Sequence, residues 1–594
     1  MTDGSVSISL TASQACWIVL GLFVPLHVLL LGWLACKNSP TSDEVAHLTA
    51  GVRIWNFGDT RGYSVNPPLV KAVATLPVVL NHPRSDWRRY SENPADRREW
   101  NVGQDFFYAN GPVTLWYFTL ARWACIPFSL IGLIYCFVWG SELSGPRGGV
   151  LAACLWCFDP NILANASLIT PDIAATSFGL ATVYHFQKWL HTRSWQDSFY
   201  TGVALGLAQL TKMTWVMLYI WLPLLWGIIR WVSKSRFQPV SVGLCQWGLI
   251  VFLSLEILNA GYGFQGTFEP LGKTEFVSRA LTGDQGMPGN RFRGSFFGMI
   301  PMPVPVDWLI GMDLQKRDFE QGWRPLPSYL RGELRMQGWW YYYLYAAAVK
   351  TPLSLFGLIA LSAISLVSTE KRNLNAEKLI ALLFIPIALF LFVSFQTGFS
   401  RYYRYVLPCL PYTYLFSSQI FQSRLLTRIR WMPWATRFLV LLLCLESLAV
   451  SPHQLGFYNV LAGGPAQGHT HLLDSNTDWG QDLYSLKDWM ISHPEARPMF
   501  LSYSGVADPR FFEIGAQPIP VFASREQVNI PKGWYAISVN HLHDYELDRP
   551  FLKPFQKIKP VGRAGFSILI YHLDEPMTQF RVAPGNTNID ENAS

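Results

Sequence analysis

The chain has 594 residues, of which 50% are hydrophobic, 15% aromatic and only 15% charged, and its net charge is +7. Soluble proteins carry about 25% charged residues, so this composition argues against an ordinary soluble domain and indicates many membrane spans. The 25 tryptophans suit the aromatic belts at membrane interfaces. Basic residues in such a protein mark cytoplasmic loops, so the positive charge does not indicate nucleic-acid binding.

Apolar runs along the chain predict an all-α polytopic membrane protein with about 11 transmembrane helices. The runs lie near residues 15–36, 113–139, 147–158, 171–190, 198–211, 214–232, 241–260, 342–367, 376–396, 402–421 and 433–451. With the N-terminus in the cytoplasm, the short inner loops collect basic residues, as the positive-inside rule requires. These residues are Arg147, Lys188, Arg193, Arg230, Lys234, Arg236, Lys371, Arg372, Lys378, Arg424, Arg428 and Arg430.

The same topology places loops 37–111 and 261–341, a short turn near 159–171 and the tail from residue 452 outside the cytoplasm. Segment 287–308 is rich in Gly, Pro and aromatics and predicts an irregular loop on the membrane surface. Segment 67–80 predicts a short interfacial helix with Pro in its first turn.

The outer tail predicts a small α/β domain. Segment 480–492 has the pattern of an amphipathic helix, and strand-like runs follow at 498–505, 533–540 and 566–573. We therefore expect a transmembrane domain at 1–451, an extracytoplasmic α/β domain at 452–580 and a disordered tail at 581–594.

Two neighbouring acids, Asp43 and Glu44, follow the first apolar segment. Ser42 precedes them, so one interpretation is a helix N-terminus with acids in its first turn. A carboxylate fixed at such a place is also suited to act as a general base. Adjacent helical residues point about 100° apart, so the two acids do not share one task. His47, four residues after Asp43, shares its helix face.

A second group of polar residues recurs at the predicted outer ends of spans. Asp172 begins one span, Lys212 ends another, and Arg401 and Arg404 lie at a third outer end. Each cation alone is explained by snorkelling toward headgroups. Cations gather at cytoplasmic rather than outer ends, however, so the set favours a phosphate-bearing lipid as its partner.

Neither metal nor cofactor is expected. The pairs His469/His471 and His541/His543 lack further ligands. The spacing of Asp474, Asn476 and Asp478 is similar to that of a calcium loop, but Trp479 replaces the required glycine and Ser485 the terminal Glu, which favours helix capping and a domain hinge. No Asp-x-Asp, P-loop or Gly-x-Ser-x-Gly motif is present.

In their order, several motifs resemble those of the membrane-embedded GT-C glycosyltransferases. They are DEVAHLTAGVRIWNFGD with NPPLVK, DPNILANASLITPDIAA, GLAQLTK, RYYRYVLPCLPY, and an outer segment containing LLDSNTDWGQDLYSLKDW. Together they resemble the bacterial relatives of dolichyl-phosphate-mannose protein mannosyltransferases and of lipid A aminoarabinose transferases. The resemblance covers most of the chain.

This resemblance implies an inverting transfer of a sugar from a polyprenyl-phosphate donor to a hydroxyl acceptor on a protein, lipid or glycan. The enzyme would be a multi-pass protein of the inner (plasma) membrane with its site on the extracytoplasmic face. Asp43 would be the general base, Glu44 its positioning neighbour, and Asp172 a further acid of the site. Lys212, Arg401 and Arg404 would hold the lipid phosphate, with Arg404 closer to the family pattern than Arg401.

Two other functions remain open at this point. A transporter or flippase of lipid-linked glycans would use the same basic site without a base. A scaffold protein would leave Asp43, Asp172, Lys212 and Arg404 scattered around no common cavity, more than about 15 Å apart on the scale of a substrate pocket.

Overall fold

The computed structural model describes residues 12–233, 240–283, 288–320, 326–367, 376–395, 400–422, 429–520, 522–523 and 527–580. Six basic residues of the predicted inner loops lie outside these ranges, namely Lys234, Arg236, Lys371, Arg372, Arg424 and Arg428. The predicted disordered tail 581–594 also lies outside them.

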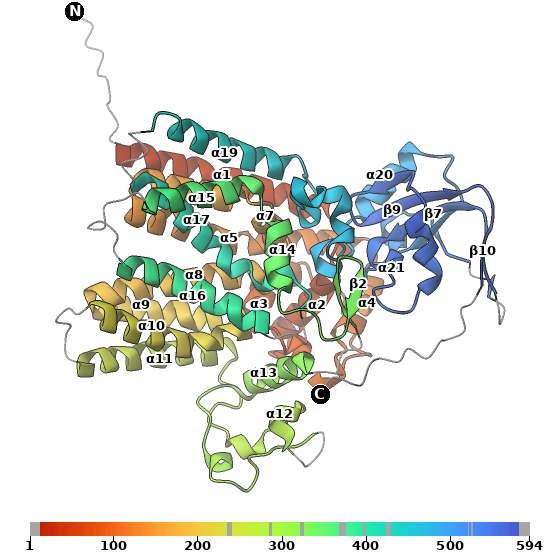
Figure 1. Ribbon diagram of the computed structural model, residues 1–594. Helices are drawn as coiled ribbons and strands as arrows, with labels where there is room; N and C mark the ends of the chain where they lie inside the picture. Colours follow the sequence, from red (N-terminus) through yellow and green to blue (C-terminus); the bar gives the residue numbers. More distant parts are fainter. Residues whose placement is uncertain are drawn as a thin grey trace, which may run out of the picture.

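Most of the chain forms long helices that run side by side (Figure 1). They are α1 (Ala12–Lys37), α5 (Val113–Ser144), α6 (Pro146–Phe158), α8 (Pro171–Thr192), α9 (Trp195–Gln209), α10 (Leu218–Ser233), α11 (Val240–Gly261), α15 (Leu353–Val367), α16 (Ala376–Phe395), α17 (Leu410–Ser418) and α19 (Met432–Leu448). Five described helical stretches are long and apolar enough to cross a membrane, or up to seven if each of two bent pairs forms one span. The protein is therefore a multi-pass membrane protein, and the predicted number of about eleven spans stays a prediction.

Two predicted spans are bent or broken, and proline explains both. Segment 342–367 forms α14 (Tyr342–Lys350) and α15, which meet at 103°. Pro352 follows the break, and the residue before a proline is held away from helical geometry. Segment 402–421 begins with 3-10 turns around Pro408 before α17 starts.

The smaller elements gather at one end of the long helices (Figure 1). They include α2 (Ser42–Phe57), α3 (Pro68–Val79), α4 (Glu99–Asn110), α7 (Pro160–Ala166), α12 (Arg279–Thr282) and α13 (Val306–Phe319). The predicted short helix at 67–80 is confirmed as α3, with Pro68 in its first turn. Segment 287–308 is largely irregular where described, whereas α13 was not predicted. A hairpin of β1 (Ser328–Leu330) and β2 (Glu333–Arg335) completes this loop.

A sheet region follows α19 at the same end of the molecule (Figure 1). Its five-stranded sheet has the order β4-β3-β7-β9-β8, with β3 parallel to β7 and β7 antiparallel to β9. The strands are β3 (Met499–Ser502), β4 (Gln517–Pro518), β7 (Gly533–Ser538), β8 (Gly562–Ala564) and β9 (Ile568–Leu573). The predicted amphipathic helix is α20 (Leu483–Ser492), which buries Leu483 and Leu486. The predicted strand-like runs thus all contain strands.

Candidate active site

Helix α2 fixes the place of Asp43. Thr41 caps the helix in a capping box, in which its backbone N–H donates to Oε2 of Glu44 at 2.8 Å. Asp43 therefore sits in the first turn, where the helix dipole favours a negative charge. Its side chain keeps 18% of its surface exposed and faces a pocket.

Glu44 points the other way, into the protein. Its side chain is 0% exposed, and Oε2 receives Nη2 of Arg122 at 2.6 Å while Oε1 receives Nε at 2.8 Å. Oε1 also accepts the backbone N–H of Ile169 at 2.8 Å. Arg122 donates further to the carbonyls of Ala35, Asn38 and Ser39. Glu44 thus ties α1, α2, α5 and the turn before α8 together, and does not line the pocket.

Asp43 and three other charged residues form a chain of alternating charge. Nη2 of Arg404 lies 3.0 Å from Oδ2 of Asp43, and Nη1 of Arg404 lies 3.8 Å from Oδ2 of Asp172. Nζ of Lys212 lies 2.6 Å from Oδ1 of Asp172. Two cations and two anions compensate one another, which lets them be partly buried. A phosphate that enters this pocket can bind Arg404 and Lys212 in place of the two carboxylates.

His47 completes the wall of the pocket on the face of α2 that carries Asp43. It is 2% exposed, and its ring lies 4.8 Å from the ring of Tyr63. Burial removes water from the imidazolium and lowers the pKa of His47 to about 4. The ring is therefore neutral at neutral pH and suited to pack against a substrate rather than to supply positive charge.

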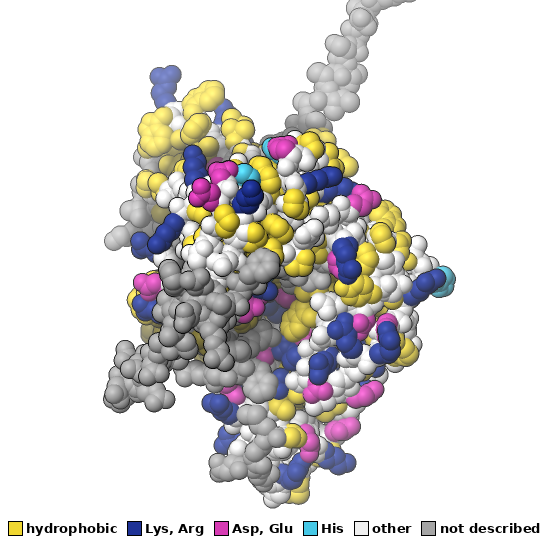
Figure 2. Space-filling model, turned by 90° about the vertical axis from the view of Figure 1, so that its right-hand side faces the viewer, with side chains coloured by type: hydrophobic (Ala, Val, Ile, Leu, Met, Phe, Trp, Pro, Cys, Tyr) yellow, Lys and Arg dark blue, Asp and Glu magenta, His cyan; other side chains and the backbone are white. Residues whose placement is uncertain are grey.

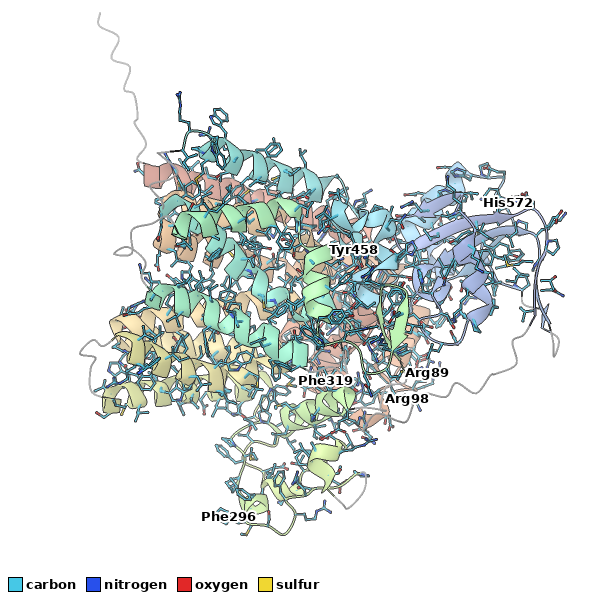
Figure 3. The ribbon with its side chains drawn as sticks, in the orientation of Figure 1. Arg89, Arg98, Phe296, Phe319, Tyr458 and His572 are labelled. Atoms are coloured by element: carbon cyan, nitrogen blue, oxygen red, sulfur yellow. The ribbon has the colours of Figure 1, made fainter. Side chains whose placement is uncertain are left out.

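The pocket formed by these residues holds a cavity of about 80 Å³. Figure 2 looks onto this end of the molecule and shows it hollowed near the centre, with acidic and basic side chains in the hollow. The lining residues are Asp43, His47, Tyr63, Val65, Asn66, Arg97, Trp100, Pro171, Asp172, Lys212, Gln315, Asp318, Phe319, Tyr402, Arg404 and Tyr405. Phe319, labelled in Figure 3, ends α13 at the pocket.

Of the two competing arginines, the structure brings Arg404 to the pocket and leaves Arg401 outside its lining. The Arg401 side chain donates to the carbonyl of Leu326. Its own carbonyl accepts hydrogen bonds from Tyr342 and Asn476. Arg401 thus connects backbone segments behind the site, whereas Arg404 faces it.

Four charged residues around the site were not predicted, namely Arg97, Glu99, Asp318 and Arg122. Arg97 joins Glu99 at 2.6 Å and Asp318 at 2.6 Å, so it links loop 37–111 to α13 at the pocket wall. Arg97 lies in the short connection before α4, and Asp318 lies in the last turn of α13, which was not predicted. The sequence therefore offers no signal for the pairing of Arg97 with Asp318. Arg122 lies inside the apolar run 113–139, and an ionisable residue within a span is a signal that sequence reasoning can use.

An apolar cavity of about 170 Å³ adjoins the polar pocket. Its walls come from the segment after Lys212, from α13 and α16, and include Met213, Phe392 and Val393. Lys212, Gln315, Phe319 and Tyr405 line both cavities. The charged pocket therefore adjoins an apolar cavity, and Lys212 lies at the boundary between them.

Within the described ranges, no group of three or more His, Cys, Asp or Glu residues is arranged to hold a metal ion. In the 474–482 segment, with its calcium-like spacing, Asp474, Asp478 and Asp482 each accept hydrogen bonds from the protein. Asp482, for instance, accepts from the backbone of Phe566 and Ser567 and from the Ser567 hydroxyl.

Comparison with known proteins gives one family match. Residues 118–254 match the model of the family described as Dolichyl-phosphate-mannose-protein mannosyltransferase. This segment holds Asp172 and Lys212, and the match confirms the resemblance found in the motifs. No curated protein matches the chain.

Three solved structures align with the chain at low identity. ArnT from Cupriavidus metallidurans bound to undecaprenyl phosphate aligns over 93% of this chain and 97% of its own, with 12% identity and a TM-score of 0.46. The apo oligosaccharyltransferase of Archaeoglobus fulgidus aligns over 80% and 58%, with 12% identity and a TM-score of 0.44. The Pmt1-Pmt2 protein O-mannosyltransferase complex of S. cerevisiae, bound to the sugar donor, aligns over 43% and 34%, with 16% identity and a TM-score of 0.30.

Proposed function

We propose that this chain is an inverting glycosyltransferase of the inner (plasma) membrane. It transfers a sugar from a polyprenyl-phosphate donor to a hydroxyl acceptor at the extracytoplasmic face. The observation that carries the proposal is the chain of Asp43, Arg404, Asp172 and Lys212, which opens both to the polar pocket and to an apolar cavity. A donor with a phosphate head and a hydrocarbon tail fits such a pair of cavities.

The phosphate is the leaving group, and its charge grows as the glycosidic bond breaks. Arg404 offers a planar fork of N–H donors and Lys212 a compact charge, both suited to phosphate. Charge stabilisation of this kind is commonly the largest single contribution to catalysis. The apolar cavity beside Lys212 then receives the first part of the lipid chain.

Asp43 acts as the general base. It takes the proton of the acceptor hydroxyl as the hydroxyl oxygen bonds to the anomeric carbon, on the side opposite the phosphate. The carbon–oxygen bond to the phosphate breaks, its electron pair leaves on the phosphate, and the configuration at the carbon inverts. The ion pair with Arg404 holds the carboxylate in place before the donor arrives.

Asp172, His47 and Glu44 have supporting roles in this proposal. In the free enzyme Asp172 pairs with Lys212 and Arg404. When the donor phosphate binds these two cations instead, Asp172 contacts the sugar or the acceptor. His47 lines the pocket as a neutral ring. Glu44 positions Asp43 through the start of α2 without contacting substrate. The family match makes a mannosyl phosphate lipid the first donor to test.

The test is transfer by the purified full-length protein from polyprenyl-phosphate mannose to hydroxyl acceptors, measured as release of lipid phosphate. Asp43→Asn should lower the rate about 10²- to 10⁴-fold, the contribution of a general base, while the protein still binds polyprenyl phosphate. Asp574→Asn changes a carboxylate that is 91% exposed and serves as the control. Full transfer by Asp43→Asn would refute the assignment, and lipid movement without transfer by the wild type would favour a flippase.

A further inference from the structure

A buried segment, residues 474–482, reaches from the C-terminal sheet region to the back of the polar pocket. It contains the acidic spacing that is similar to a calcium loop. Asn476, Thr477, Asp478, Trp479 and Gln481 are all buried. The segment, called here the 474–482 loop, contacts both elements that carry the ion pair of Asp43 and Arg404.

The first contact is with the start of α2. The backbone N–H of Ser42 donates to the carbonyl of Trp479 at 3.0 Å, and that of Ser39 donates to the carbonyl of Gln481 at 2.9 Å. The Ser39 hydroxyl also donates to the carbonyl of Gly480 at 2.8 Å. The residues just before Asp43 are therefore fixed to this loop.

The second contact is with residues 401–404. The side chain of Asn476 accepts the backbone N–H of Tyr403 at 2.8 Å and donates to the carbonyl of Arg401 at 2.7 Å. A single amide thus holds the backbone on both sides of Tyr402. Arg404 follows directly.

The third contact is made by the indole of Trp479 with Arg404 itself. The guanidinium carbon of Arg404 lies 4.1 Å from the Trp479 ring centre and 4.7 Å from the ring centre of Tyr402. Nε of Arg404 is buried and makes no hydrogen bond within the described part of the chain. Aromatic faces attract a guanidinium and fix its plane. Trp479 is 4% exposed and does not line the pocket, so its indole, unlike its carbonyl, reaches the site through Arg404.

The loop is itself held by the region after α19. Asn540, just after β7, accepts the backbone N–H of Asp474 at 2.9 Å and donates to the carbonyl of Asp478 at 3.1 Å. The Tyr458 hydroxyl lies 2.6 Å from that of Thr477, and Figure 3 labels Tyr458 beside α14. The C-terminal region thereby provides a rigid support behind the ion pair.

We infer that Trp479 is a positioning residue that orients the Arg404 guanidinium toward the donor phosphate, and that the C-terminal sheet region serves the site by holding the 474–482 loop. This inference rests on the proposed function, because it names the phosphate as the ligand of Arg404. It gives the calcium-like spacing a structural use, in which the side chains bind the protein itself.

The test uses the full-length protein and measures its affinity for polyprenyl phosphate together with kcat and KM for the polyprenyl-phosphate sugar. Trp479→Leu and Trp479→Met each remove the ring and keep an apolar side chain. Both should weaken lipid-phosphate binding about 10-fold, as expected for loss of a desolvated cation–π contact. Trp479→Phe keeps an aromatic face and should restore most of the affinity.

A double-variant cycle separates positioning from a general structural effect. In an Arg404→Ala background, Trp479→Leu should weaken binding no further, because the guanidinium that the indole orients is absent. Trp489→Leu, in α20, removes an indole that stacks on His493 at 4.0 Å and should leave binding unchanged. Wild-type affinity in both Trp479→Leu and Trp479→Met, or additive losses with Arg404→Ala, would overturn the inference. Failure of the wild type to bind polyprenyl phosphate would instead refute the proposed function.

Discussion

The two cavities that meet at Lys212 differ in almost every physical respect. One is walled by two acids and two cations in alternation, brought together from α2, the start of α8, the turn after α9 and the segment before α17. The other is walled by side chains such as Met213, Phe392 and Val393. The difference teaches what kind of ligand the site takes, since only an amphiphile gains from both.

The two cavities also depend on different forces. The polar pocket is costly to build, because each charge leaves water and must be compensated by a partner. The apolar cavity contains no charges that need compensation, and it gains binding free energy when it removes a hydrocarbon chain from water. Disturbing the first should therefore cost much in either folding or turnover, and disturbing the second should cost modestly and in proportion to the length of the lipid.

The largest effect should come from the acid behind the polar pocket. Glu44→Ala leaves Arg122 buried without its carboxylate partner, and breaking a buried ion pair on one side costs about 3–5 kcal/mol of folding free energy. We expect a large drop in thermal stability, measured by unfolding of the purified protein in detergent.

Asp43→Asn is the matched comparison, because it changes the neighbouring acid on the pocket side. It should lower transfer while leaving thermal stability near that of the wild type. A Glu44→Ala variant as stable as the wild type would contradict the supporting role of Glu44.

These two acids also show how far the sequence leads. Helix-start chemistry predicted Asp43 and Glu44 in the first turn of a helix, and α2 begins at Ser42. The direction in which each acid points was not predictable, because it depends on Arg122, 78 residues away from Glu44 along the chain. The same limit applied to Arg401 and Arg404, whose separation into backbone support and pocket wall follows from a tight turn that periodicity does not reveal.

The ordered helices and the C-terminal strands followed from hydrophobic pattern, since that pattern is local. The link from Arg97 to Asp318 joins the connection before α4 to the end of α13, 221 residues later along the chain. The 474–482 loop contacts segments more than 400 residues earlier. Contacts of this kind depend on tertiary structure and leave no periodic trace. The charge set of Asp43, Asp172, Lys212 and Arg404 was nevertheless predicted on one side of the membrane, and the structure brings these four residues together.

The second largest effect should follow from removing the forked cation. Arg404→Ala takes away the donors that face the phosphate, and loss of one such preorganised donor costs about 100- to 1000-fold in kcat. The measurement is steady-state release of lipid phosphate. Arg401→Ala is the control: it removes a cation three residues away that does not line the pocket, and transfer by the folded protein should stay close to that of the wild type. The reverse ranking would exchange the roles of the two arginines.

The third effect is a loss of stability at low pH, and it arises from His47 in the polar pocket. Burial lowers the pKa of His47 from 6.5 to about 4, so the unfolded chain binds a proton more readily than the folded one. The contribution of His47 to the free energy of unfolding is therefore present above pH 6.5 and is lost as the pH falls toward 4. By linkage, the loss between pH 7 and pH 5 is about 2 kcal/mol.

Thermal unfolding at pH 7 and pH 5 measures this loss. Asp43, Asp172, Lys71 and Arg404 also act on His47 by their charges, so the informative quantity is the difference between variants. His47→Gln cannot take up the proton and should lose less stability on acidification than the wild type. Equal losses in both proteins would show that His47 does not titrate as its burial indicates.

The smallest effect should come from filling the apolar cavity. Val393 lines it from α16, and Val393→Trp would occupy the space of a few methylene groups of the donor lipid. Each buried methylene contributes about 0.8 kcal/mol, so displacing two of them weakens binding roughly tenfold. We expect a higher KM for a long-chain donor and almost no change for a short-chain analogue that ends before the cavity. Leu391→Trp, two residues earlier on α16 and 48% exposed, should leave both donors unaffected. If Val393→Trp raises KM equally for the short-chain donor, the apolar cavity supports the structure of the polar pocket and does not bind the lipid chain. That result would contradict the separate roles assigned to the two cavities.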